Sequence, residues 1–215
     1  MSWLVSTRQY IPAVIGEAWG GGYFAGYISH TADGNPTHAL IVAPRATGAT
    51  GTGYTLTGNL QWKTATTATA GTASDFDGAA NTAAMVAAGI NDHPSAKFCV
   101  DLSIGGFTDW YLPSRLELDI AYFNLKPSTQ ANFTSSGINS YSVPKRTINN
   151  TATHPAQTNL SAFNTSSEAF AAFFHWSSTE VNAANGWGLS FSDGSLGGNA
   201  KTNVNRVRAF RRIAL

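Results

Sequence analysis

The sequence predicts an α+β fold. Short apolar runs bounded by turn residues read as strands in the first and last thirds of the chain, and segments with helix-capping signals lie between them. At 215 residues with 43% hydrophobic side chains, the chain can bury a substantial core. Its single cysteine, Cys99, rules out an intrachain disulfide.

Charge is scarce in this sequence. Only 12% of residues are charged, against about 25% in ordinary domains, and the net charge is +1. We therefore expect no nucleic-acid partner, because the chain has no strong field to attract one. The apolar run "YIPAVIG" is interrupted by Pro12 and is too short for a signal peptide or a membrane span. We expect a chain made in a cytoplasm, without membrane insertion.

The first third of the chain predicts an arm followed by a hairpin. Residues 1–22 end in "WGGGY", whose glycines can separate an attachment arm from a body spanning residues 23–215. Residues 23–30 and 37–45 flank the turn signal Asp33-Gly34, so they predict a hairpin. The second run is almost continuously apolar, which predicts a strand buried on both faces.

The middle third predicts one short strand and two helices. "LQWKT" (60–64) reads as a strand. The alanine-rich segment 77–89 predicts a helix capped by Asp77 and stopped by Gly89. Residues 92–102 predict a second, short helix that begins near a proline.

The stretch "GGFTDWYLPSRLELDIAYF" (105–123) fits two patterns. Its apolar residues alternate as in a strand, and they also match one face of a helix. The capping box formed by Ser114 and Glu117, directly after Pro113, favours the helix. Apolar residues on its opposite face predict that this helix is covered on two sides.

The last part of the chain predicts an insert and a return to strands. Residues 126–172 are long and polar, which in a compact domain is typical of an interaction loop. Three later segments predict strands, namely 173–180, 186–195 and 205–213. Residues 196–204 are expected to form a loop.

Four blocks give the chain a family resemblance. "GGFTDWYLPSRLEL", "HWSSTE", "GWGLSFSDG" and "RVRAFRRI" occur in the order found in the bacterial and phage domains called DUF1566. That group is related to the Fib-succ-major and formylglycine-generating-enzyme-like domains. The chain departs from the pattern at Tyr111, where the family usually has arginine, and in the insert at 126–172.

The resemblance implies a C-type lectin-like fold, with small twisted antiparallel sheets, two or three helices and long loops. The whole chain further resembles tailed-phage virion proteins, starting from "GEAWGGGYFAGYISH". The motif residues also have folding roles of their own: glycine turns, a carboxylate acceptor, buried indoles and strand hydroxyls. The residues we expect to act as structural framework are Gly106, Asp109, Trp110, Leu112, Pro113, Glu117, Trp176, Ser177 and Ser178.

Candidate chemistry is weak by comparison. Formylglycine-generating enzymes hold copper with a cysteine pair, and Cys99 stands alone. Asp109 and Glu117 could form an acid and base pair, although a turn acceptor and a capping carboxylate explain them better. His30 and His38 can approach each other across the hairpin, yet two histidines make a weak zinc site. We expect no catalytic residue, metal or cofactor.

Other binding motifs are equally weak. "GNPT" (34–37) lacks the acidic neighbour of a calcium-dependent sugar site. The arginines of "RVRAFRRI" alternate with apolar residues, so they predict a closing strand with paired guanidinium groups. No Ser-His-Asp arrangement stands out.

The expected function is that of a non-enzymatic phage virion protein. Residues 1–22 would attach a C-type lectin-like domain to other virion proteins, and homo-oligomers such as trimers or rings fit a symmetric particle. The domain would recognise a host-surface glycan or protein. A capsid decoration or fibre-attachment protein with a purely structural role is the alternative. In related display domains the recognition face follows the Trp-Ser-Ser strand, which implicates Asn182, Asn185, Trp187, Asp193, Ser195 and Asn199, with Tyr141 and His154 of the insert as neighbours.

Overall fold

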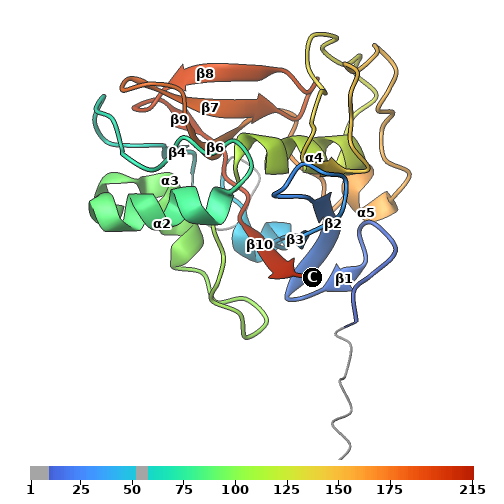
Figure 1. Cartoon of the computed structure of the whole chain (residues 1–215), viewed down its shortest axis with the longest axis horizontal. Coiled ribbons are helices and arrows are strands. Elements are labelled where there is room, and N and C mark those ends of the chain that lie inside the picture. Colours follow the sequence, from blue (N-terminus) through green and yellow to red (C-terminus); the bar gives the residue numbers. More distant parts are fainter. Residues whose placement is uncertain (1–9, 52–57) are drawn as a thin grey trace, which may run out of the picture.

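The computed structural model describes residues 10–51 and 58–215. Its architecture is α+β, with small curled antiparallel sheets and short helices, as expected for a C-type lectin-like arrangement (Figure 1). The sheets pair residues from opposite ends of the chain, so both termini of the described fold belong to one sheet.

The main sheet has the order β1-β2-β3-β10, and β5 also pairs with β2. Its strands are β1 (Ala18–Trp19), β2 (Gly22–Ile28), β3 (His38–Val42), β5 (Ser142–Val143) and β10 (Phe210–Ala214). The predicted hairpin is confirmed, because β2 and β3 pair antiparallel. The four residues 39–42 of β3 are fully buried, as the apolar run predicted.

The N-terminal segment reaches the same sheet. Tyr23 of β2 pairs with Ala18 of β1, so the described part of the predicted arm packs against the body. Residues 1–9 lie outside the described residues, and the arm's role in attachment stays a prediction.

A second sheet has the order β6-β7-β8, and a two-stranded sheet pairs β4 with β9. Their strands are β6 (Phe174–Glu180), β7 (Asn185–Ser190), β8 (Leu196–Ala200), β4 (Leu60–Gln61) and β9 (Val204–Asn205). The prediction of a loop over residues 196–204 was wrong, since β8 pairs with β7 from Leu196 opposite Leu189. Glycine-rich "LGGNA" carries no strand signal in its side chains, and its pairing depends on backbone groups facing β7.

The predicted closing strand is also shorter than expected. Residues 205–213 divide into β9 and β10, and the residues between them make only isolated bridges. The predicted pairing of its guanidinium groups is confirmed: Arg208 reaches Glu168 at 2.9 Å, Arg212 reaches Asp77 at 2.7 Å, and Arg211 pairs with Asp109.

Three longer helices carry the predicted signals. They are α2 (Gly78–Gly89), followed by the single 3-10 turn η1 (Ile90–Asp92), then α3 (Pro94–Val100) and α4 (Arg115–Leu125). Asp77 accepts the Ala80 amide at 2.8 Å, which confirms the cap of α2. Single-turn helices α1 (Arg45–Gly48) and α5 (Ser161–Asn164) complete the set in the described residues.

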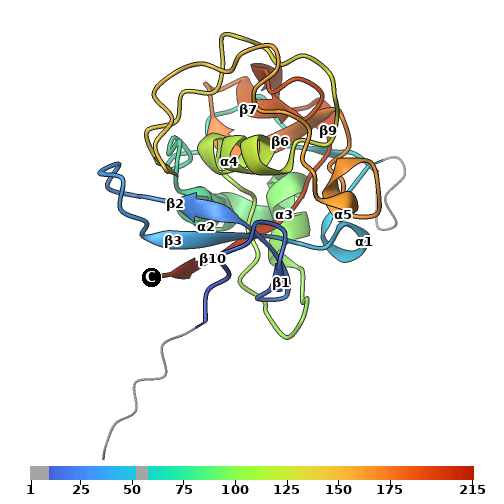
Figure 2. The same ribbon diagram turned by 90° about the vertical axis from the view of Figure 1, so that its right-hand side faces the viewer.

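Helix α4 lies at the centre of the fold, between the main sheet and the loops of the insert (Figure 2). Leu118 and Leu125 are fully buried, and both belong to a core cluster that includes residues of β2, β3 and β7. The prediction that this helix is covered on two sides is confirmed. Because the Ser114 capping box starts α4, the motif sets where this central helix begins.

Candidate functional site

The glycine pair of the motif forms a tight turn. Gly105 and Gly106 have φ of 61° and 82°. A Cβ on Gly105 would lie 2.9 Å from Gly21 Cα, so the turn packs directly on the N-terminal segment. Trp110 follows, 2% exposed, with its indole donating to the Phe107 carbonyl at 3.1 Å. The turn therefore joins the motif to the start of the main sheet.

Asp109 binds a partner that the sequence did not indicate. The sequence predicted a turn acceptor, and the partner that Asp109 accepts is the guanidinium of Arg211. Its side chain is 54% exposed, whereas that of Arg211 is 11% exposed. Asp109 thus balances an arginine that β10 would otherwise bury unpaired.

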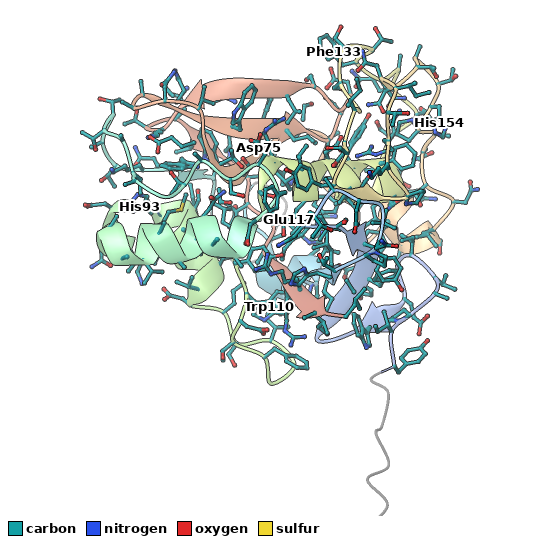
Figure 3. All side chains as sticks on the ribbon, viewed as in Figure 1. Asp75, His93, Trp110, Glu117, Phe133 and His154 are labelled. Carbon is teal, nitrogen blue, oxygen red and sulfur yellow. The ribbon has the colours of Figure 1, made fainter. Side chains whose placement is uncertain are left out.

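Glu117, labelled in Figure 3, is fully buried and accepts hydrogen bonds from three residues. Its Oε2 accepts the Ser114 amide at 2.7 Å and the Gly78 amide at 3.2 Å, and Ser114 Oγ accepts the Glu117 amide at 3.3 Å. Tyr111 donates its hydroxyl to the other carboxylate oxygen at 2.7 Å. Burial raises the pKa of Glu117 to about 7, and these hydrogen bonds oppose that rise. The capping box is confirmed, and it also ties the start of α2 to the start of α4.

Asp109 and Glu117 do not form a shared reactive pair. Glu117 has no exposed surface, and its two oxygens are occupied by the partners named above. Asp109 pairs instead with Arg211 of β10, and its side chain is about half exposed. A general acid or base must reach a substrate proton, and Glu117 offers no access for that transfer. The geometry favours the structural roles expected for both carboxylates.

The Trp-Ser-Ser strand is held by reciprocal indole bonds. Trp176 donates to the Leu60 carbonyl and Trp62 donates to the Ser177 carbonyl, both at 2.8 Å. Ser177 Oγ donates to the Trp187 carbonyl at 2.9 Å, and Ser178 Oγ accepts from Asn81 at 3.2 Å. Leu112 is fully buried beside these indoles, and the Pro113 carbonyl accepts the Ser178 amide at 2.7 Å.

The two hairpin histidines do meet. Their ring centroids lie 4.3 Å apart, and Arg212 Nη1 lies 3.2 Å from His30 Nε2. Burial and the Arg212 charge lower the pKa of His30 to about 4. The Arg212 guanidinium therefore disfavours a cation at His30 Nε2, and Asp77 lies 3.7 Å from the other ring nitrogen. In residues 10–51 and 58–215, no group of three potential ligands is arranged to hold a metal ion.

The residues proposed for a recognition face lie in several places. Asn182 and Asn185 form one turn, bonded to each other at 3.3 Å, while Asp193 and Ser195 form the turn at the other end of β7 at 2.8 Å. Trp187, in β7 between these turns, has the Arg115 guanidinium 5.5 Å from its ring centroid.

Asn199 points away from Trp187, on the other face of this sheet. A Cβ on Gly188, the residue next to Trp187, would lie 3.3 Å from Asn199 Nδ2. Tyr141 stacks on Phe76 at 4.3 Å, and exposed His154 meets the edge of Phe123 at 5.2 Å. Of these eight residues, Asn182 bonds to Asn185 and Asp193 bonds to Ser195, whereas Trp187, Tyr141 and His154 contact side chains outside the set.

A family comparison covers most of this architecture. The model of the Lcl C-terminal domain matches residues 51–211. The chain belongs to the Lcl C-terminal domain family. This family is related to the DUF1566 domains that the four blocks resemble. No curated protein matches the chain.

The matched span of the Lcl C-terminal domain includes the motif turn, α4, the insert and the second sheet, whereas the β2–β3 hairpin precedes it. Within the described residues, no helix is both long and apolar enough to cross a membrane. The framework contacts thus lie within the matched family domain. Strands β2 and β3, which precede the matched span, complete the main sheet.

The insert at 126–172 of this Lcl C-terminal domain is an ordered layer over α4 (Figures 2 and 3). Buried asparagines hold it, which sequence reasoning missed. Asn139 donates to the Leu116 carbonyl at 3.0 Å and to Asp119 at 2.7 Å, and Asn132 accepts the Tyr122 hydroxyl at 2.5 Å. Asparagine is common in surface loops, so its burial here has no signal in the sequence.

The outer side of this layer exposes large apolar side chains. Phe133, Ile138 and Ile148 are 46%, 57% and 75% exposed. Asn139 and Arg146 pair through their backbones, and so do Ser136 and Asn150, which places Ile138 and Ile148 on neighbouring segments. We call the exposed side of residues 126–172 the insert surface. Exposed apolar residues on an ordered surface are typical of interaction sites.

Proposed function

We propose that this chain is a non-enzymatic phage virion protein whose insert surface recognises a host-surface glycan or protein. The observation that carries the proposal is that the motif carboxylates are bonded within the framework, while the insert exposes large apolar side chains. The motif carboxylates are used in framework contacts with Arg211, Tyr111 and Ser114. The insert, by contrast, is hydrogen-bonded to α4 on its inner side and exposes apolar side chains on its outer side.

The rigidity of the insert supports a binding role. A loop that is already ordered loses less conformational entropy when it binds a partner. Asn139, Asn132 and Asn150 are at most 6% exposed, so the layer is fixed by hydrogen bonds beneath its surface. The surrounding low charge suits close contact with a partner rather than long-range attraction.

The virion setting comes from the resemblance of residues 16–30 and the four blocks to tailed-phage virion proteins. We propose that the protein is assembled in the host cytoplasm, is tail-associated and is oligomeric. The N-terminal residues would bind other virion proteins. Electron microscopy of antibody-labelled particles tests this setting, and deletion of residues 1–9 tests the arm. Incorporation of the deleted protein at the normal level would contradict attachment through those residues.

Binding of purified, labelled protein to bacterial cells tests the recognition role. Saturable binding that unlabelled protein competes away is the expected result. Particles that carry the protein, combined with no saturable binding to cells that the phage infects, would instead favour the decoration or fibre-attachment role. The exposed apolar side chains of the insert surface would then be contacts to a neighbouring virion subunit.

A further inference from the structure

We propose that a small cavity between α4 and the insert binds the N-acetyl group of an uncharged N-acetylated sugar. This inference rests on the function proposed above and names the ligand class. The cavity has a volume of about 80 Å³. Since a cavity of about 150 Å³ holds a benzene ring, this one suits a group of only a few heavy atoms. An acetamido group, with one methyl and one amide, has that size.

The walls of the cavity are mainly apolar. They are formed by Ile120 and Phe123 of α4 and by Val143 and Pro144 of the insert. Phe123 and Val143 are partly buried, and Pro144 is exposed. These side chains offer the acetyl methyl an apolar contact on both sides, which favours its transfer from water. A sugar hydroxyl in the same place would find few partners.

Two polar side chains match the amide of the acetyl group. Arg146 lies over the Phe123 ring at 4.5 Å, and its Nη1 is buried with no hydrogen-bond partner among the described residues. Asn124 donates from Nδ2 to the Ala25 carbonyl at 2.7 Å, and its Oδ1 accepts from no described residue. An acetamido carbonyl can accept from Arg146, and its N–H can donate to Asn124. An unpaired buried donor is costly, so a ligand acceptor beside it is favoured.

Charge at the cavity favours a neutral ligand. The Arg146 guanidinium pairs with Asp119, and the side chains are 11% and 3% exposed. Because the pair is largely buried and internally balanced, a carboxylate or sulfate would gain little from Arg146 while losing its hydration. The same pair fixes the guanidinium plane beside the ring of Phe123. The cavity is therefore suited to a hydrogen-bond acceptor without charge.

Ligand-observed NMR of the full chain tests the proposal with N-acetylglucosamine and glucose. We expect the acetyl methyl protons of N-acetylglucosamine to receive the strongest saturation from the protein, and glucose to bind about tenfold more weakly, since it lacks the methyl and amide contacts. Equal binding of the two sugars, or no binding of either, would overturn the assignment. If the protein still binds cells in that case, the recognition function stands and only the ligand assignment fails. If the protein binds neither the sugar nor the cells, both proposals fail.

Matched variants locate the site. Val143→Trp fills the cavity and should abolish N-acetylglucosamine binding, while Val181→Trp, at an exposed turn residue after β6, should not. If Val143→Trp fails to fold, Val143→Met gives the same test with less added volume and should weaken binding at least about threefold. Binding that is unchanged in a folded Val143 variant would contradict the cavity assignment.

Discussion

Tyr111 donates its hydroxyl to Glu117 Oε1 at 2.7 Å, at the position where DUF1566 domains usually carry arginine. A phenol satisfies the carboxylate oxygen but brings no positive charge to it. Burial therefore dominates and raises the pKa of Glu117 to about 7. This relationship makes the start of α4 sensitive to pH.

Because of the Glu117 carboxyl, we expect the free energy of unfolding to depend on pH. Its folded-state pKa lies above the usual value of 4.5, so the folded protein binds the proton more tightly and loses stability as pH rises from about 4.5 through 7. The total loss should approach about 3 kcal/mol. Glu117→Gln removes the titration. Chemical denaturation at pH 5 and pH 8 should show the wild type losing more stability than the variant, and identical losses would contradict the buried, titrating carboxyl.

We expect His175 to make the free energy of unfolding depend on pH in the opposite direction. It is fully buried, its Nδ1 lies 3.0 Å from the Phe173 carbonyl, and burial lowers its pKa to about 3. The unfolded chain takes up the proton near pH 6.5, so this group costs stability as pH falls below that value. By pH 5 the cost should be about 2 kcal/mol. His175→Asn removes this cost, so it should weaken the protein less at pH 5 than at pH 7, by about 2 kcal/mol, as denaturation midpoints can show.

The exposed His154 provides the control for this substitution. His154→Asn removes a histidine from the insert surface without touching the aromatic cluster around His175. An acid response that changes equally in both variants would show that the buried ring is not its source.

Gly186 should tolerate no side chain. A Cβ there would lie 2.8 Å from Trp62 Cδ1, against the indole that donates to Ser177. Gly186→Ala should cost about 2 kcal/mol of unfolding free energy through overpacking. Gly197→Ala is the matched control, because its Cβ would meet Phe174 at 3.5 Å, an ordinary contact. Equal stability of the two variants, measured by denaturation, would mean that the Trp62 packing is wrong.

Asn139 should be the main anchor of the insert. Besides its two donated bonds, its Oδ1 accepts the amides of Tyr141 and Ser142 at 3.1 and 3.0 Å. Asn139→Ala leaves these buried groups unpaired and should cost about 3 kcal/mol. Hydrogen exchange should accelerate most in residues 136–150.

Asn149→Ala changes the same residue type at an exposed position of the insert and should leave exchange unaltered. Uniform acceleration across the whole protein in Asn139→Ala would show that the insert does not open as a separate unit.

The sequence predicted those parts of the fold whose signals are local. The Asp77 cap and the Ser114–Glu117 capping box each depend on residues within one turn, and both are confirmed. Strand β8 was missed because its glycines pair through backbone groups alone. Ion pairs such as Lys201 with Glu180 join distant segments, so no spacing in the sequence could indicate them.

The candidate site was harder to predict for the same reason. The residues chosen around β7 are close in sequence, yet the register of β7 with β8 sends Trp187 and Asn199 to opposite faces of the sheet. The cavity beside α4 combines Phe123 with Arg146 across the insert, and only the folded chain brings them together.

The binding of two single-residue variants to bacterial cells tests the central claim most directly. Ile148→Lys alters the insert surface at a side chain 75% exposed, and Val86→Lys makes the same kind of change on α2 at a side chain 47% exposed. With both proteins equally stable, we expect Ile148→Lys to weaken cell binding at least about tenfold and Val86→Lys to leave it unchanged. Full binding by Ile148→Lys, together with loss in Val86→Lys, would contradict recognition by the insert surface.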